Sequence, residues 1–345
     1  MANYTTINKG TDHFNTILYV ADQVDGRNIT GVGFQPDWVW IHNRTQSVNS
    51  MVYDAVRGVT KDLVTNSTLA QATSTDGLQA FIADGFTHGN GWGNQTTGDN
   101  YVAWNWKANG AGSSNSNGSI ASTVSANTTA GFSIVKWAGS GANATIGHGL
   151  GAAPEMVVTK SLGTSSWGVY HKGLGNTNVL FWDTNGVTSA NVAYWNNTSP
   201  TSTVFSVGTD SAVNHSGNDM IAYCFRSIRG YSKIGTYKGN GLADGPSVYT
   251  GFKPAMMFFK RTAGGNANWQ MWDNKRDPDN PVENAYHIDS NNADGSPDQD
   301  IDFLSTGFKI RSNQGHLNND GNVFVYYAVA EEALVGTNKV CATAR

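Results

Sequence analysis

The sequence predicts an all-β protein made of three similar antiparallel β-sandwich (jelly-roll-like) domains in tandem. Three observations lead to this prediction. Charged residues make up only 14% of the 345 residues, and this composition disfavours long helices, whose outer faces are normally charged. Short apolar runs alternate with turn residues, a spacing typical of sandwiches. A set of motifs also recurs in the same order in three segments.

The composition also argues against several classes of partner. The net charge of −4 provides no basic field for nucleic acid. No apolar run approaches the length of a membrane span, and the first residues lack the basic and apolar regions of a secretory signal. We therefore expect neither nucleic acid nor a membrane as a partner.

A proline precedes a short apolar strand in each of the three segments. These prolines are Pro36, Pro154 and Pro254, and each follows a turn that contains glycine. Proline lacks a backbone donor, so it fits the first position of a strand and not its middle. Each proline lies 22 or 23 residues after an aromatic residue that opens the segment, namely Phe14, Phe132 and Tyr231.

The strand after Pro36 is apolar on both faces. Trp38 and Trp40 share one face, and Val39 and Ile41 share the other. Strands of this kind are covered on both sides. We therefore expect one face of this strand to pack inside its own domain and the other to meet a further layer or a partner domain.

An aromatic residue followed by a polar one is the second repeated marker. It occurs as Tyr53-Asp54, Tyr170-His171 and Trp272-Asp273. Arginine stands three residues after each aspartate, at Arg57 and Arg276, whereas the second segment has Leu174 there. We interpret each Asp–Arg pair as a local ion pair that fixes a turn.

The repeat spacing sets the domain boundaries. Successive prolines are 118 and 100 residues apart, a distance typical of whole domains and too long for solenoid units. We place the first domain at residues 1–110, the second at 131–230 and the third at 231–333. A connector rich in Gly, Ser, Asn and Thr covers residues 111–130, and a C-terminal tail covers residues 334–345.

The sequence carries no motif of a known catalytic site. There is no nucleophile elbow, no zinc-binding His-Glu-X-X-His and no phosphate-binding glycine loop. Carboxylates are sparse outside residues 277–302, so no glycosidase pair can be assigned. We predict that the protein is not an enzyme, and we assign no catalytic residue, cofactor or metal site.

The acidic stretch that begins at Asp289 resembles a calcium-binding loop in composition. Its glycine, Gly295, is the seventh residue, whereas an EF-hand loop has glycine at the sixth. Asp298, Asp300 and Asp302 add oxygen ligands, which leaves an irregular Ca²⁺ site open. The preferred interpretation is an acidic, solvated loop.

Four aromatic residues lie in Gly- and Asn-rich surroundings outside the shared strands: Trp92, Trp182, Tyr194 and Trp195. Aromatic faces beside amide and hydroxyl groups suit sugar rings, so these residues are candidates for contact with glycans. The alternative is ordinary packing of loop aromatics, or burial against a neighbouring subunit.

Taken together, the motifs resemble a repeated domain of structural proteins in tailed-bacteriophage virions, common in phages of marine bacteria and often labelled tail fibre. The resemblance rests on Gly33 to Arg44, Tyr53 to Gly58, Asp84 to Phe86, Tyr101 to Ala108 and the ending from Val335. It covers nearly the whole chain. The second segment departs most, because it lacks the Phe of the turn before Pro154 and the arginine.

The resemblance implies a surface-exposed virion protein, assembled in the bacterial host cytoplasm, of the tail-fibre or receptor-binding type used in host attachment. Its expected partners are other virion proteins, further copies of itself (a trimer by analogy) and host surface polysaccharide. Two alternatives remain at this stage: a capsid decoration or head-fibre protein, and a polysaccharide depolymerase.

Overall fold

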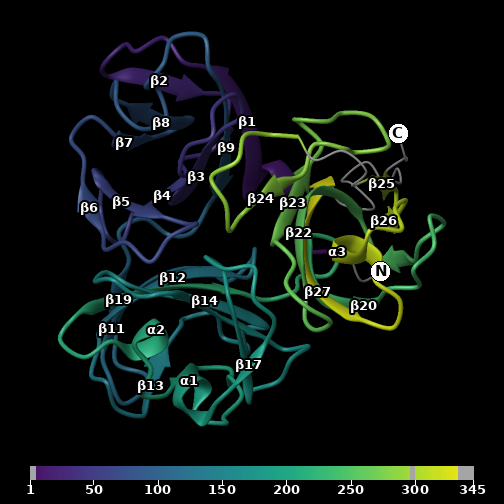
Figure 1. Cartoon of the computed structure of the whole chain (residues 1–345). Helices are drawn as coiled ribbons and strands as arrows, with labels where there is room; N and C mark the ends of the chain where they lie inside the picture. Colours follow the sequence, from purple (N-terminus) through teal and green to yellow (C-terminus); the bar gives the residue numbers. More distant parts are fainter. Residues whose placement is uncertain (1–4, 296–299, 333–345) are drawn as a thin grey trace.

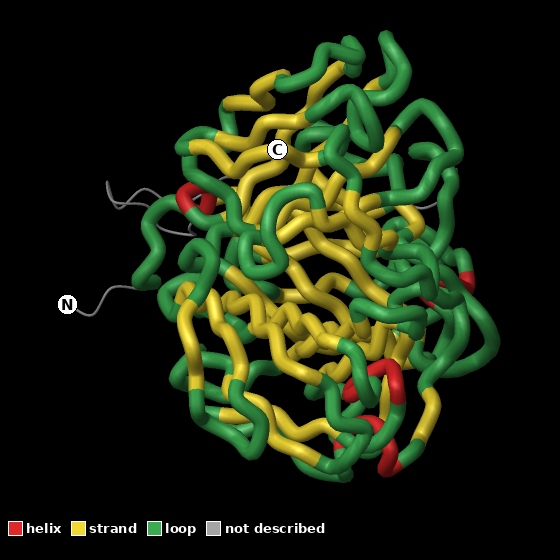
Figure 2. Tube along the Cα trace, turned by 90° about the vertical axis from the view of Figure 1, so that its left-hand side faces the viewer, coloured by secondary structure: helices red, strands yellow, loops and turns green. Residues whose placement is uncertain are grey.

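Three two-sheet units surround a common centre in the computed structural model, which describes residues 5–295 and 300–332 (Figure 1). Their sheets are antiparallel and are joined mostly by turns and loops, and the helices within the described residues have only three or four residues (Figure 2). The all-β class predicted from the sequence is confirmed, and the paired sheets are consistent with β-sandwich domains.

Unit 1 has a large sheet of order β1-β9-β3-β4-β5-β6 and a small sheet of order β2-β8-β7. Its elements are the 3-10 helix η1 (Gly10–Asp12) and the strands β1 (Phe14–Val20), β2 (Arg27–Thr30), β3 (Trp38–Asn43), β4 (Met51–Asp54), β5 (Lys61–Val64), β6 (Ala72–Thr73), β7 (Leu78–Ile82), β8 (Gly85–His88) and β9 (Asn100–Trp106).

Unit 2 has a large sheet of order β10-β11-β12-β19-β14-β15-β16-β17 and a small sheet of β13 and β18. Its elements are β10 (Ser113–Asn115), β11 (Ser122–Asn127), β12 (Phe132–Ala138), β13 (Ala144–Gly147), β14 (Met156–Ser161), β15 (Trp167–His171), β16 (Asn178–Phe181), β17 (Ser189–Ala190), α1 (Val192–Trp195), β18 (Val204–Val207), α2 (Ser211–Asn214) and β19 (Asp219–Phe225).

Unit 3 has a large sheet of order β20-β27-β22-β23-β24 and a small sheet of order β21-β26-β25. Its elements are β20 (Ser232–Lys238), β21 (Ser247–Tyr249), β22 (Lys253–Arg261), β23 (Gln270–Asp273), β24 (Tyr286–His287), β25 (Ile301–Leu304), β26 (Gly307–Ile310), α3 (Gly315–Asn318) and β27 (Val323–Glu332).

The three units share one strand order. In each large sheet the opening strand pairs with the closing strand, which pairs with the strand after the repeated proline. In each small sheet the strand that follows the opening strand pairs with the one that carries the repeated phenylalanine. The strand orders therefore define equivalent positions in the three units.

The segment predicted as a connector, residues 111–130, also forms part of unit 2. Its strands β10 and β11 pair with each other, and β11 pairs with β12 along the edge of the large sheet. Residues 334–345, predicted as a tail, lie outside the described residues.

The aromatic that opens the third segment is one residue out of register with the other two. Phe14 and Phe132 pair with Trp106 and Phe225, but the equivalent pair in unit 3 is Ser232 with Val329. Ser232, and not Tyr231, is therefore the counterpart of Phe14. The spacing of 23 residues from Tyr231 to the proline, against 22 in the other segments, reflects this offset.

The repeated prolines lie where a strand begins. Pro36 and Pro154 stand two residues before β3 and β14. Pro254 is the second residue of β22, where the pairing with β27 shifts register on both sides of it. A proline is tolerated there because a bulge removes the ladder hydrogen bond that proline cannot donate.

Each large sheet is buried on both faces. In β3, Val39 and Ile41 pack against the small sheet of unit 1, whereas Trp38 and Trp40 belong to the central core shared by all three units. β14 and β22 are buried along their whole length in the same way. The two-faced apolar pattern predicted for the strand after Pro36 is confirmed.

Trp182 is a residue of unit 2 that meets all three units in this core. Its ring centroid lies 5.0 Å from that of Trp40 in unit 1, 6.0 Å from that of Trp167 in unit 2 and 5.8 Å from that of Phe258 in unit 3. The side chain is fully buried. An indole at this place fills the space that three converging sheets leave between them.

We predict that Trp182→Ala destabilises the protein by about 3–5 kcal/mol, because it opens a cavity where no single unit can close it. Chemical denaturation monitored by fluorescence measures the change. The control is Trp92→Ala, since Trp92 is only half-buried at the edge of the unit 1 core and a smaller loss is expected. Equal losses in the two variants would contradict the central role of Trp182.

Candidate functional site

The interface between units 1 and 2 is built on a buried carboxylate at the end of β4. Asp54 Oδ1 accepts hydrogen bonds from the backbone N–H groups of Val56 and Arg57, at 3.1 and 2.8 Å, which fixes the following turn. Asp54 Oδ2 pairs with Arg57 Nε at 2.5 Å and accepts a hydrogen bond of 2.8 Å from the Tyr223 hydroxyl of unit 2. These four contacts compensate for the lost hydration of both charged groups.

The interface between units 3 and 1 repeats this arrangement. Asp273 Oδ1 accepts hydrogen bonds from the N–H groups of Lys275 and Arg276, at 3.0 and 2.9 Å, and Oδ2 pairs with Arg276 Nε at 2.6 Å. The indole N–H of Trp104, from β9 of unit 1, donates to the same Oδ2 at 3.0 Å. The Asp–Arg pair therefore fixes a turn, as interpreted from the sequence, and it also holds a neighbouring unit.

The interface between units 2 and 3 uses a neutral residue at the equivalent position. His171 Nδ1 accepts a hydrogen bond of 3.0 Å from the N–H of Gly173, and Nε2 lies 3.3 Å from the carbonyl oxygen of Tyr326 in unit 3. This network assigns the proton to Nε2. Burial lowers the pKa of His171 to about 4, so the ring is neutral at pH 7. A neutral ring needs no cation, and Leu174 stands where the other units have arginine.

The three contacts follow one cyclic order, because the residue at the Asp54 position of unit 1 faces unit 2, that of unit 3 faces unit 1 and that of unit 2 faces unit 3. Unit 2 donates to unit 1 and unit 1 donates to unit 3, whereas at the third contact His171 of unit 2 is the donor and a carbonyl of unit 3 accepts. Two further indole hydrogen bonds follow the same direction, from Trp167 Nε1 to the Val64 carbonyl at 2.9 Å and from Trp269 Nε1 to the Phe181 carbonyl at 2.7 Å. Contacts of this head-to-tail kind close into a ring, here within one chain.

Ser50 of unit 1 stands at the position that Trp167 and Trp269 occupy in the other two units. Because serine is small, a larger side chain of unit 3 fills the volume at this interface. Tyr286 of unit 3 occupies the position that is Leu63 in unit 1 and Leu180 in unit 2. Its ring stacks on Trp104 of unit 1 at 5.5 Å. At this interface the large side chain therefore comes from unit 3, and the small one comes from unit 1.

A buried basic residue stands at one position of the strand after the repeated proline: His42, Lys160 and Lys260. Lys160 Nζ donates to the Thr68 carbonyl of unit 1 at 3.3 Å, and Lys260 Nζ donates to the Thr184 carbonyl of unit 2 at 3.4 Å. Burial lowers the pKa of each lysine to about 8. The sequence analysis missed these residues, although a basic residue in an apolar strand is a visible signal.

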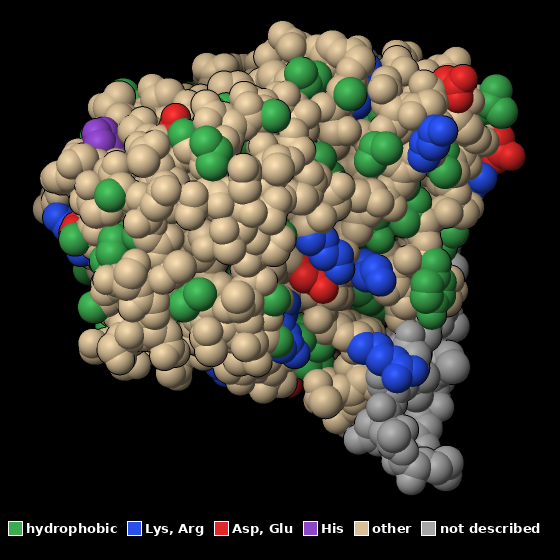
Figure 3. Space-filling view, turned by 90° about the horizontal axis from the view of Figure 1, so that it is seen from below, with side chains coloured by type: hydrophobic (Ala, Val, Ile, Leu, Met, Phe, Trp, Pro, Cys, Tyr) green, Lys and Arg blue, Asp and Glu red, His purple; other side chains and the backbone are tan. Residues whose placement is uncertain are grey.

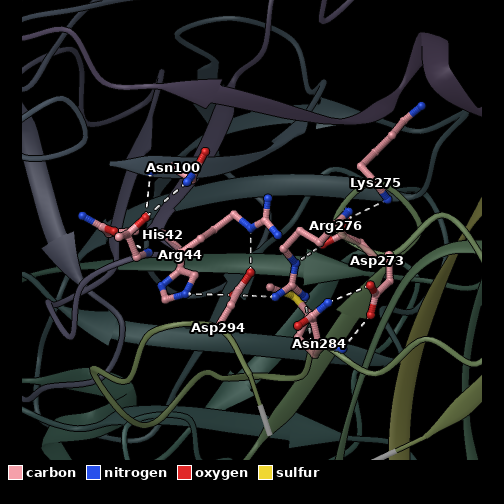
Figure 4. A network of polar contacts seen from close by, with 12 residues as sticks. His42, Arg44, Asn100, Asp273, Lys275, Arg276, Asn284 and Asp294 are labelled. Atoms are coloured by element: carbon pink, nitrogen blue, oxygen red, sulfur yellow. Dashed lines mark hydrogen bonds and ion pairs between the residues drawn. The ribbon is translucent and has the colours of Figure 1, made fainter. Parts of the chain in front are cut away.

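His42 belongs to the densest polar network between units, which centres on Asp294 (Figure 4). Asp294 Oδ2 pairs with Arg44 Nε at 2.6 Å, and Oδ1 lies 2.8 Å from an Arg276 guanidinium nitrogen and 3.3 Å from His42 Nε2. Burial opposes ionisation of Asp294, but Arg276, His42 and Arg44 outweigh it and hold its pKa well below the usual range. The network thus ties unit 3 to unit 1.

Three carboxylates of the acidic stretch that begins at Asp289 contact protein groups. Asp294 lies in the network above, Asp289 Oδ1 accepts the N–H of Trp269 at 3.1 Å, and Asp302 Oδ2 pairs with Arg311 Nε at 3.0 Å. Asp298 lies outside the described residues. The interpretation as a solvated loop is wrong for Asp294, whose side chain is 7% exposed.

Three of the four glycan candidates are not on the surface. Trp182 lies in the central core, and Trp195 is buried with its indole N–H donating to the Asn178 carbonyl at 3.0 Å. Tyr194 is buried with its ring 5.7 Å from that of Phe181. These three residues pack inside unit 2 and the core, so the expectation of glycan contact is wrong for them. Trp92 is half-buried.

The remaining repeat markers, Tyr53 and Trp272, point into their own units. Both are fully buried, and Trp272 stacks on Phe259 at 4.8 Å. Alternation along a strand explains the pairing of an aromatic with a polar residue: the aromatic fills its own unit, and the next side chain faces the neighbour.

Within the described residues, no cluster of three or more His, Cys, Asp or Glu side chains could hold a metal ion. In the same part of the chain, no helix is long and apolar enough to cross a membrane. Open pockets of 490, 280 and 250 Å³ lie outside the interfaces just described.

The structure is thus that of a three-unit, all-β protein whose buried charges hold the units together. The chain belongs to a family described as "Domain of unknown function (DUF7483)", whose match covers residues 9–333. The match spans all three units of this chain. No curated protein matches the sequence.

We predict that Asp294→Asn costs about 3–5 kcal/mol of stability, because it removes the buried carboxylate from Arg44 and leaves Arg276 with Asp273 alone. The control is Asp244→Asn: Asp244 is 81% exposed in its pair with Lys309, and a much smaller loss is expected because solvent screens the pair. The folded pKa of Asp294 lies below its unfolded value, so its contribution is complete above about pH 4 and is lost as the pH falls. Denaturation at stepwise lower pH should show this loss in the parent protein and not in Asp294→Asn.

We predict that Arg57→Leu costs about 3–5 kcal/mol, because Asp54 then keeps a buried charge without its cation. The double variant Asp54→His/Arg57→Leu copies His171 and Leu174 of unit 2 and should recover part of this loss, since the histidine is neutral. Urea denaturation of the single and double variants gives the coupling. If the stability loss of the double variant equals the sum of the losses of its two single variants, the charge match between positions 54 and 57 does not govern the interface.

Proposed function

We propose that this chain is a non-enzymatic structural protein of a tailed-phage virion, exposed on the particle as a tail-fibre or receptor-binding component. The proposal rests on the resemblance of the segments Gly33 to Arg44 and Tyr101 to Ala108 to virion proteins, and on the build of the molecule. Other virion proteins, further copies of the chain and host surface polysaccharide are its proposed partners.

The observation that carries the structural role is the use made of buried polar groups. Asp54, Asp273 and Asp294 would be the natural candidates for acid–base work in a buried setting, and each is engaged by arginine and by donors of a second unit. Groups neutralised in this way stabilise an assembly. This use of charge favours a structural role over the depolymerase alternative.

A capsid decoration or head-fibre protein is the second candidate, and one observation favours it. The ring closes within a single chain, so the described residues form a block of three equivalent units around a centre (Figure 1). A block of this shape suits covering a surface as well as capping a fibre. In either position the outer faces of the small sheets point away from the core.

Antibodies against the purified protein test the proposal on intact particles. Gold-labelled antibody should bind the particle, at the tail for the receptor-binding role and over the head for the decoration role. Particles that contain no such antigen would overturn the proposal. Incubation with host polysaccharide should release no reducing ends, and turnover that a carboxylate-to-amide variant abolishes would establish the depolymerase instead.

A further inference from the structure

An open pocket lies where the chain passes between units. It has a volume of 490 Å³ and is lined by Thr5 and Thr6 ahead of unit 1, Thr128 and Thr129 ahead of β12, and residues 226–229 ahead of β20. The segments that lead into the opening strands of the three units therefore meet around one cavity. Its size lies in the range of small-ligand sites.

The lining chemistry is basic and rich in hydroxyl groups. The described lining residues include Arg226, Arg229 and four threonines, and no carboxylate is among them. Guanidinium groups are suited to carboxylate and phosphate, and hydroxyls both donate and accept hydrogen bonds. The cavity is thus complementary to an anion that carries further oxygen atoms.

Arg226 is held firmly at this cavity. Its N–H donates to the Gly131 carbonyl at 2.9 Å, and its own carbonyl accepts a hydrogen bond of 3.1 Å from the Ser232 hydroxyl. A Cβ on Gly131 would lie 2.6 Å from Arg226 Cγ, so only glycine leaves room for the arginine stem. The backbone and the first part of the arginine stem are therefore fixed beside the cavity.

The described part of the chain provides no carboxylate partner for Arg226. Among residues 5–295 and 300–332, no carboxylate lies within ion-pair distance of it, and its buried Nε has no hydrogen-bond partner. The nearby Glu155 is engaged by Lys172 at 2.8 Å and by the Ser227 hydroxyl.

The other two pockets show the contrast. Lys136 in the 280 Å³ pocket pairs with Asp219 at 2.8 Å, and Arg311 in the 250 Å³ pocket pairs with Asp302 at 3.0 Å. Seen from below, over unit 2, the surface is mostly uncharged, and basic side chains gather toward the lower centre of the view (Figure 3). Arg226 thus differs from Lys136 and Arg311, the cations of these two pockets, in lacking a carboxylate partner within the described chain.

We infer that this pocket binds an acidic saccharide, whose carboxylate or phosphate pairs with Arg226 and whose hydroxyls hydrogen-bond to Thr128 and Thr129. The inference deepens the proposed contact with host polysaccharide and rests on that function for the saccharide, whereas the anion site follows from the cavity alone. The proposed glycan contact therefore lies at the junction of the three units and not at the buried aromatics Trp182, Tyr194 and Trp195.

Calorimetric titration with glucuronic acid, glucose 6-phosphate and glucose tests the inference. Both acids should bind and glucose should bind at least about 10-fold more weakly, because it lacks the charge-assisted pair. The two acids separate a uronic acid source from a phosphorylated one. Equal binding of glucose, or no binding of either acid, overturns the inference.

Arg226→Gln should weaken binding of the preferred acid by about 10-fold or more, and Arg226→Lys should weaken it less. Lys136→Gln is the matched control, because Lys136 is already paired with Asp219, and it should leave binding unchanged. Melting without ligand checks the fold of each variant. If Arg226→Gln does not fold, Thr129→Val removes an exposed hydroxyl instead and should also weaken binding. Unchanged binding in the folded variants overturns the inference.

The outcomes separate the site from the proposed function. Acid binding that depends on Arg226, together with particles that lack the antigen, would keep the site and reject the virion role. Labelled particles with a protein that binds no acid would keep the virion role and reject the site.

Discussion

A sheet that is apolar on both faces must be covered twice, and the rest of this structure depends on that constraint. Each unit covers one face of its large sheet with its own small sheet. The other face carries residues such as Trp38, Met156 and Met256, which only neighbouring units can bury. Three units that share this need can satisfy it together by closing around a centre, where Trp182 fills the remaining space. The driving force is the burial of apolar area.

Closing the ring also buries polar groups. The ion pairs and hydrogen bonds at the interfaces compensate for the hydration that these groups lose. A buried carboxylate at the end of β4 or β23 is tolerated because an arginine of the same unit pairs with it and a donor of the next unit hydrogen-bonds to it, as at Asp54 and Asp273. Where unit 2 has His171, the ring is neutral and Leu174 replaces the arginine. Within each unit, a charged residue at this position is accompanied by an arginine three residues later, and the neutral histidine is accompanied by leucine. Between units 1 and 3, the small Ser50 is accompanied by the large Tyr286.

The sequence was sufficient to predict the all-β class and the order of the repeated strands, because alternation and turn residues are local signals. Burial on both faces of the strand after Pro36 was also predictable from its four apolar residues. Trp182 was misplaced because its neighbours, Asp183 and Asn185, resemble a surface loop, whereas its environment is set by the other two units. The Asp294 network could not be predicted either, since Arg44 and Asp294 are separated by 250 positions in the chain.

Internal repetition has a consequence for binding that a homotrimer does not share. Three identical chains would present any site three times, but three units in one chain can diverge. The position of Arg226 shows this divergence: the pairing that aligns Trp106, Phe225 and Val329 makes Lys107 and Ala330 its counterparts. Lys107 lies over the ring of Phe34 at 6.0 Å, and alanine carries no charge, so the arginine stands alone among the three. A chain of this design keeps the symmetric core that holds it together while its surface specialises at one junction.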